Sequence, residues 1–133
     1  VYNMATRINI AFQRANGQVV VTYCHYDGYL EYNGVMLNEH YNNQSKAEEL
    51  ANQGYLSSLK PTIKESLDDR ANIQPPTIYH SAHTFYNDVQ FDIEWIYLFK
   101  NNQWYVSVGQ STFIENDLQP LWSVLAKLEK ESA

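Results

Sequence analysis

Residues 23 to 34, with the sequence YCHYDGYLEYNG, carry a thiol, an imidazole, two carboxylates and four phenols within twelve positions. Cys24 is a candidate nucleophile, and His25 is a candidate base for it. Both follow an apolar run that predicts a β-strand, and neighbouring side chains of a strand point to opposite faces. The two groups should therefore not meet, and we expect Cys24 to be a small buried or half-buried thiol.

Metal binding is the second chemistry that these residue types allow. His80 and His83 could act as zinc ligands together with a third group. The candidates for that third group are His25, Asp27 and His40. Because the two histidines have no second ligand pair of matching spacing, we expect no metal site and no cofactor.

Acid and base catalysis by two carboxylates is the third chemistry. Asp27 could act with Glu31. Asp92 could act with Glu94, but solvated strands and turns commonly produce such spacings. The glycines of the opening stretch have neither a Walker lysine nor the spacing of a dinucleotide fingerprint. No enzyme class is supported, and we expect no catalytic residue.

The opening stretch also has a simpler structural interpretation as a turn between a strand and a helix. Asp27 would accept local backbone hydrogen bonds, Gly28 would adopt a positive φ, and Gly34 would let the next helix start close to the sheet. Tyrosines displayed around such a turn offer a large contact area with a polar tip and are enriched in binding hot spots. The predicted binding residues are His25, Tyr26, Asp27, Tyr29, Glu31 and Tyr32.

Length and charge narrow the function further. The 133 residues suffice for one domain, and fifteen acids against nine bases give a net charge of −6. This charge argues against direct binding of nucleic acid but suits a basic protein surface. A single cysteine and the lack of a long apolar run predict a soluble protein of the host cytoplasm without membrane contact. We expect one domain over residues 4–133, with residues 1–3 a non-native remnant before Met4.

The first predicted unit is a β-hairpin. Asn16-Gly17 separates two apolar runs and is the strongest short-range signal for a hairpin. A two-residue turn at this point pairs Phe12 with Val21. It also pairs Ile8 with His25, so that His25 lies at the far edge of the core face.

A second hairpin is predicted over residues 91–109, with its turn at Asn101-Asn102. Its core face carries Phe91, Ile93, Trp95, Tyr97, Phe99, Trp104, Val106 and Val108. The opposite face carries Ile96, Leu98 and Tyr105, which would form a homodimer surface if nothing covers it. A further strand is expected near residues 84–89.

Helices are predicted between and after the hairpins. One covers residues 35–41, and the next has a capping box of Ser45 with Glu48 and ends at Gly54. Residues 60–77 are expected to be a flexible connection. A final amphipathic helix is expected, with Asn116 or Asp117 as its cap and Pro120 in its first turn. Its apolar stripe consists of Leu118, Leu121, Trp122, Leu125 and Leu128.

Together these elements predict an α+β fold. The expected sheet is antiparallel, has about five strands and is built from the two hairpins. Two short helices are inserted after the first hairpin, and the C-terminal helix packs on one face of the sheet.

Spaced motifs extend over residues 6–108. They are His25, Asp27-Gly28-Tyr29, Gly34, Leu37, Tyr41, Gly54, Ser57-Ser58-Leu59, Glu94-Trp95, Tyr97 and Trp104-Tyr105. In this order they resemble a family of small, largely uncharacterised bacteriophage and prophage proteins. Its members carry an aromatic residue or His, then Asp-Gly-Tyr-Pro, a glycine before a helix, and Gly-Asp-Ile-Ser-Ser-Leu after the next helix. Leu30 replaces the proline and Tyr55-Leu56 replaces Asp-Ile here. The resemblance implies a phage origin rather than a mechanism.

Two functions stay open at this point. The first, which we expect, is a non-enzymatic viral protein that inhibits or diverts a bacterial host factor, such as a defence component, as an anti-CRISPR or anti-restriction protein does. The second is a small-ligand module that sequesters or cleaves a signalling nucleotide. In that case tyrosines would stack on the base, with His25, Arg7 or Arg70 near phosphate. A structural virion role is a weaker third.

Overall fold

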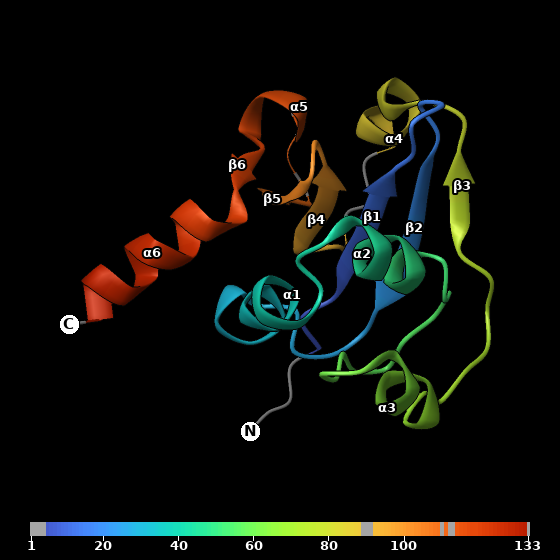
Figure 1. The fold of residues 1–133 in the computed structure, drawn as a ribbon, viewed down its shortest axis with the longest axis horizontal. Coiled ribbons are helices and arrows are strands. Elements are labelled where there is room, and N and C mark those ends of the chain that lie inside the picture. Colours follow the sequence, from blue (N-terminus) through green and yellow to red (C-terminus); the bar gives the residue numbers. More distant parts are fainter. Residues whose placement is uncertain (1–4, 89–91, 110, 112–113, 133) are drawn as a thin grey trace.

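The computed structural model describes residues 5–88, 92–109, 111 and 114–132 (Figure 1). The predicted start at Met4 and the predicted core position of Phe91 lie outside these residues. The α+β fold class is confirmed, with a sheet of order β3-β2-β1-β4-β5-β6. The strands are β1 (Ile8–Gln13), β2 (Val19–Cys24), β3 (Thr77–Tyr79), β4 (Trp95–Lys100), β5 (Gln103–Val108) and β6 (Gln119–Pro120).

The sheet is mixed rather than antiparallel. Strands β1 and β4 run parallel, with Ile8 opposite Trp95 and Phe12 opposite Phe99, whereas the other neighbouring pairs are antiparallel. The two predicted hairpins are therefore present but are joined side by side through a parallel contact at the centre of the sheet. Strands β3 and β6 lengthen the sheet at its two edges to six strands among the described residues, against the expectation of about five.

Helices lie on both faces of the sheet and at one end of it (Figure 1). They are the π-helix η1 (Leu30–Gly34) and the helices α1 (Val35–His40), α2 (Gln44–Ala51), α3 (Ile63–Asp68), α4 (Ala82–Asn87), α5 (Ile114–Asp117) and α6 (Leu121–Ser132). Helix α2 packs on β1 and β2, while α6 contacts β5 and η1 and projects from the body of the domain (Figure 1). Among the described residues, no helix combines the length and the apolar character that a bilayer span requires.

The turn of the first hairpin has three residues, not two. Arg14 N donates to the Gln18 carbonyl at 2.7 Å, which closes a loop of residues 15–17. Within this loop only Gly17 has a positive φ, of 94°. The Asn16 carboxamide oxygen accepts from Gln18 N at 3.0 Å and so stabilises the longer turn.

This longer turn moves the register of β2 by one residue. Ile8 lies opposite Cys24 instead of His25, and Phe12 lies opposite Val20. Because strand side chains alternate, a shift of one residue exchanges the two faces of the strand. The prediction that His25 borders the core face is therefore wrong, and Cys24 takes that place.

The second hairpin has the predicted register. Asn101 and Asn102 have φ values of 50° and 63°, as a two-residue type I′ turn requires. Phe99 then lies opposite Trp104, and Tyr97 lies opposite Val106. All four of these core side chains are buried.

The sheet has an apolar core on each face. One core joins Ile10, Phe99 and Trp104 to the helices α1, α2 and α6. The other core buries Ile96 and Leu98 beneath side chains of α4 and α5. Ile96 and Leu98 are thus covered within the chain, so the condition for a homodimer surface, that nothing covers this face, is not met at these two residues.

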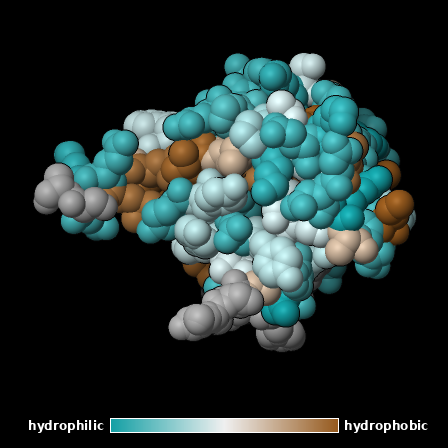
Figure 2. Space-filling model, turned by 90° about the horizontal axis from the view of Figure 1, so that it is seen from below, coloured by the Kyte–Doolittle hydropathy of each residue, from teal (hydrophilic) through white to brown (hydrophobic). Residues whose placement is uncertain are grey.

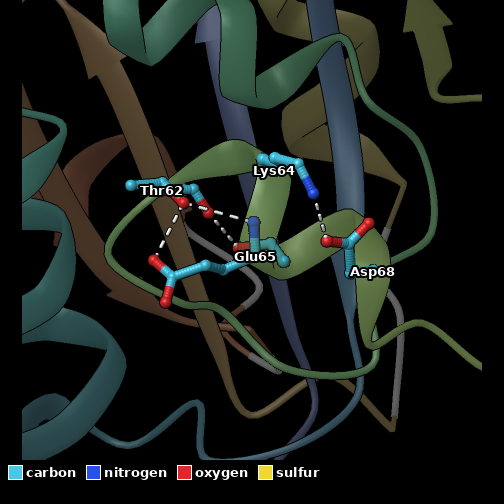
Figure 3. A network of polar contacts seen from close by, with 5 residues as sticks. Thr62, Lys64, Glu65 and Asp68 are labelled. Carbon is cyan, nitrogen blue, oxygen red and sulfur yellow. Dashed lines mark hydrogen bonds and ion pairs between the residues drawn. The ribbon is translucent and has the colours of Figure 1, made fainter.

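The segment 60–77, predicted to be a flexible connection, contains the short helix α3. The Thr62 hydroxyl caps this helix by accepting from Glu65 N at 3.2 Å and donating to the Glu65 carboxylate at 2.8 Å (Figure 3). Lys64 and Asp68 add an exposed ion pair of 2.7 Å one turn apart (Figure 3). The flexibility of the segment stays a prediction.

Several predicted ends of elements differ from the structure. Residues 84–87 belong to helix α4, because the Ser81 hydroxyl caps it by accepting from Thr84 N at 3.1 Å, and not to a strand. Helix α2 is capped by Asn43 rather than Ser45. The predicted helix end at Gly54 has the positive φ typical of a glycine after a helix, at 85°. Helix α6 begins at Leu121, so the predicted capping residues belong instead to α5 and the proline to β6.

Candidate functional site

The predicted binding residues lie in the tyrosine loop, which we define as residues 25–34 between β2 and α1. Gly28 N donates to the Thr6 carbonyl at 3.0 Å, and the Tyr97 hydroxyl donates to the Gly28 carbonyl at 2.7 Å. A Cβ on Gly28 would lie only 2.1 Å from Ile8 Cγ2. The positive φ predicted for Gly28 belongs instead to Asp27, at 60°. Gly28 is needed for close packing on β1.

Asn33 connects the two ends of the tyrosine loop. Its side chain is fully buried, and its carboxamide donates to the Tyr26 carbonyl at 3.2 Å. Its backbone N–H donates to the Asp27 carbonyl at 3.2 Å. The loop then ends in η1, where Gly34 N donates to the Tyr29 carbonyl five residues earlier at 3.4 Å. The backbone of the loop is thus held by hydrogen bonds at both ends.

Cys24 lies directly before this loop and is fully buried, as the sequence predicts. Burial raises the pKa of its thiol to about 12. The nearest polar partners of Sγ are the Asn33 carboxamide at 3.7 Å and the Tyr26 carbonyl at 3.8 Å. A buried thiol with a raised pKa is a poor nucleophile at neutral pH.

Cys24 is therefore expected to resist alkylation in the folded protein. At pH 8 iodoacetamide should modify the native chain on the order of a hundredfold more slowly than the chain in guanidinium chloride, because the thiolate is scarce and shielded. Mass spectrometry of timed samples measures both rates. Equal rates would mean that Cys24 is accessible and that β2 has another register.

Aromatic rings form a continuous row along the exit of β2. The ring centroids of Tyr55 and Tyr23 are 5.7 Å apart, those of Tyr23 and His25 are 5.9 Å apart, and those of His25 and Tyr26 are 4.6 Å apart. The Tyr23 hydroxyl also bonds His25 Nδ1 at 2.7 Å. This bond holds the half-buried imidazole in place, so His25 supports the exposed Tyr26.

The predicted binding residues differ in exposure. Tyr26 and Tyr29 each have 42% of their surface exposed, and Glu31 is exposed as well. His25, Asp27 and Tyr32 are half-buried. The rings of Tyr29 and Tyr32 lie 6.3 Å apart, so that Tyr32 supports Tyr29 from one side. The structure therefore offers Tyr26, Tyr29 and Glu31 for contact.

The histidines considered as metal ligands, His80 and His83, have local partners. His80 Nε2 lies 3.5 Å from the Thr84 hydroxyl, and His83 Nε2 lies 3.0 Å from the Asn87 carboxamide. Within residues 5–88, 92–109, 111 and 114–132 there is no group of three His, Cys, Asp or Glu side chains that could hold a metal ion.

A groove of about 570 Å³ lies beside the tyrosine loop, between η1–α1 and α6. We call it the acidic groove. Its lining consists of Glu31, Val35, Asn38, Glu39, Trp122, Leu125, Ala126, Leu128 and Glu129. Figure 2 shows apolar side chains gathered on the projecting arm that α6 forms. The groove thus combines an apolar floor with three carboxylates.

Trp122 is the residue of this groove that the sequence interpretation misplaced. The sequence pattern places Trp122 on the apolar stripe of the C-terminal helix, yet 62% of its surface is exposed, whereas Leu121 is fully buried. Successive helical residues are turned by about 100°, so Trp122 lies to one side of the direction shared by Leu121, Leu125 and Leu128, where it still lines the groove with Leu125 and Leu128. Plotting the stripe around the helix would have revealed this.

Comparisons with known proteins add no functional information to the geometry of the site. No family model, no curated protein and no solved structure matches this chain. The resemblance to bacteriophage proteins thus stays a prediction from spaced motifs.

Proposed function

We propose that this chain is a non-catalytic protein-binding protein that contacts its partner through the tyrosine loop. The observation that supports this most is the pair of exposed rings, Tyr26 and Tyr29, on a backbone fixed by hydrogen bonds to the sheet. A surface already held in its binding conformation loses little entropy on association. Tyrosine is also enriched among the residues that dominate binding energy.

The loop's local structure adds a second argument. The π-helix η1 is a rare conformation that occurs frequently at functional sites. It places Glu31 on the surface close to the exposed rings in sequence. A partner surface with Lys or Arg beside an apolar patch would complement these groups.

The partner that we propose is a bacterial host factor, with a defence component of the kind blocked by anti-CRISPR or anti-restriction proteins as the leading candidate. The spaced motifs resembling phage proteins and the net charge of −6 support this choice. Nucleotide sequestration is less well supported. Two of the groups proposed for phosphate binding, Arg7 and His25, both engage the Tyr23 hydroxyl within the protein.

The test is affinity capture from bacterial lysate with three tagged proteins. They are the wild-type chain, the double variant Tyr26→Ala/Tyr29→Ala, and the variant Ile78→Ala. Ile78 is a matched control because it is an apolar side chain that is 53% exposed on the edge strand β3. We expect a stoichiometric protein to bind the wild type and the control, and at least tenfold less of it to bind the double variant.

Thermal unfolding of the three proteins should be similar, because the replaced side chains are exposed. Retention of the partner by the double variant would place the contact surface elsewhere. A nucleotide in the eluate without a protein would instead favour the small-ligand function.

A further inference from the structure

The acidic groove has an apolar floor that the described part of the chain leaves partly uncovered. On α6, Leu121 is fully buried, Leu125 and Leu128 are half-buried, and Trp122 is mostly exposed. Val35 of α1 forms the opposite wall. Tryptophan is enriched among the residues that dominate binding energy, and here Trp122 lines a groove between two helices.

The charges of the groove are all of one sign. Glu31, Glu39 and Glu129 line it, and among the residues that the structure describes no Lys, Arg or His does. All three carboxylates are exposed, so they are free to meet cations from a partner. Like charges gathered around an apolar floor favour an occupant with an apolar stripe and flanking positive charges.

We propose that the acidic groove binds a basic amphipathic helix of a protein partner. Such a helix would lay its apolar residues, spaced three and four apart, on Trp122, Leu125 and Leu128. Its Lys or Arg side chains would reach the three glutamates. This inference rests on the proposed protein-binding function and names the chemistry of the partner segment.

A second copy of this chain fits the groove less well. Symmetric pairing of two grooves would bring the glutamates of one copy close to those of the other, because the same surface meets itself in a two-fold dimer. Like charges directly opposed across an interface disfavour association.

The experiment uses two synthetic helical peptides of about 18 residues with the same leucine stripe. One peptide carries Lys on both flanks of the stripe, and the other carries Glu at the same positions. Trp122 is the reporter, and the variant Trp122→Phe identifies its share of the fluorescence. We expect the basic peptide to protect Trp122 from acrylamide quenching and to bind at least tenfold more tightly than the acidic one. Its affinity should fall as salt is raised.

Charge variants locate the binding. The double variant Glu39→Lys/Glu129→Lys should weaken the basic peptide at least tenfold. Glu115→Lys is the control, since it reverses an exposed charge on α5 outside the groove. Equal binding of both peptides, no binding of the basic peptide, or equal weakening by the control would overturn the proposal. A dimer of the chain alone would also overturn the proposal if sedimentation detects it and Trp122 in it is protected from acrylamide quenching.

Failure of the groove assignment can be distinguished from failure of the proposed function of the tyrosine loop. If the basic peptide does not bind but capture depends on Tyr26 and Tyr29, only the groove assignment fails. If the peptide binds and the captured partner ignores both tyrosines, only the role of the tyrosine loop fails.

Discussion

Replacing Gly28 with alanine is expected to lower the free energy of unfolding by about 3 kcal/mol, at the upper end of the usual cost of overpacking. The new Cβ would lie 2.1 Å from Ile8 Cγ2 and 2.4 Å from the Thr6 carbonyl oxygen. Ile8 is the fully buried first residue of β1 and Thr6 precedes it by two residues, so the tyrosine loop must move instead. Urea unfolding followed by circular dichroism measures the loss, and binding through Tyr26 and Tyr29 should weaken with it.

Gly34→Ala is the matched control for this substitution. A Cβ there would meet the Tyr97 hydroxyl at 3.5 Å and one methyl each of Leu121 and Leu125 at 3.6 Å, which are ordinary contacts. Because Gly34 is helical, alanine should leave the stability unchanged or raise it by about 0.5–1 kcal/mol. If Gly28→Ala were as stable as this control, the loop could not rest on β1 as described.

Leu121→Ala is expected to lower the stability of the domain, whereas Trp122→Ala is expected to abolish peptide binding and leave the stability nearly unchanged. Leu121 is fully buried and joins α6 to the core, so its truncation should lower the free energy of unfolding by about 3 kcal/mol. Trp122 is mostly exposed, so its truncation should change stability by less than about 0.5 kcal/mol. It should nevertheless abolish binding of the basic peptide.

Urea unfolding of both variants, together with peptide binding monitored by calorimetry, tests this pair. Calorimetry is needed because the fluorescent reporter is absent from one variant. Similar stability losses in the two variants would mean that α6 packs with another face. Unchanged peptide affinity in Trp122→Ala would show that this side chain does not form the groove's contact surface.

The sequence predicts the two hairpins because short turns are encoded locally. At Asn101-Asn102 both residues take the positive φ that the sequence suggests, and the register follows. At Asn16-Gly17 the same kind of signal predicts a loop that is one residue too short. Only Gly17 has a positive φ there, and the hydrogen bond between Arg14 and Gln18 closes a three-residue loop. One additional residue in the turn thus exchanges the two faces of β2.

Neighbours that are distant in sequence could not be predicted in this way. The pairing of Ile8 with Trp95 depends on how the two hairpins meet, and no local pattern encodes it. Helix α4 was missed because its short sequence also suits a strand, and only the cap at Ser81 distinguishes the two.

The candidate site was predicted in part. The tyrosine loop follows from its turn residues, although which rings are exposed depends on packing, as for Tyr26 and Tyr32. The acidic groove could not be predicted, because it joins Glu31 and Glu39 to Trp122 across most of the chain.

The parallel contact between β1 and β4 also bears on how the protein is made. Strand β1 is central in the sheet, and its partner β4 is translated only after β2, β3 and the helices α1 to α4. While the ribosome is still adding residues, the first hairpin has an open edge and apolar side chains on both faces, among them Ile10 and Ala11. The centre of the sheet can therefore form only once β4 has been synthesised, and until then the open edge of the hairpin is exposed to pairing with other chains.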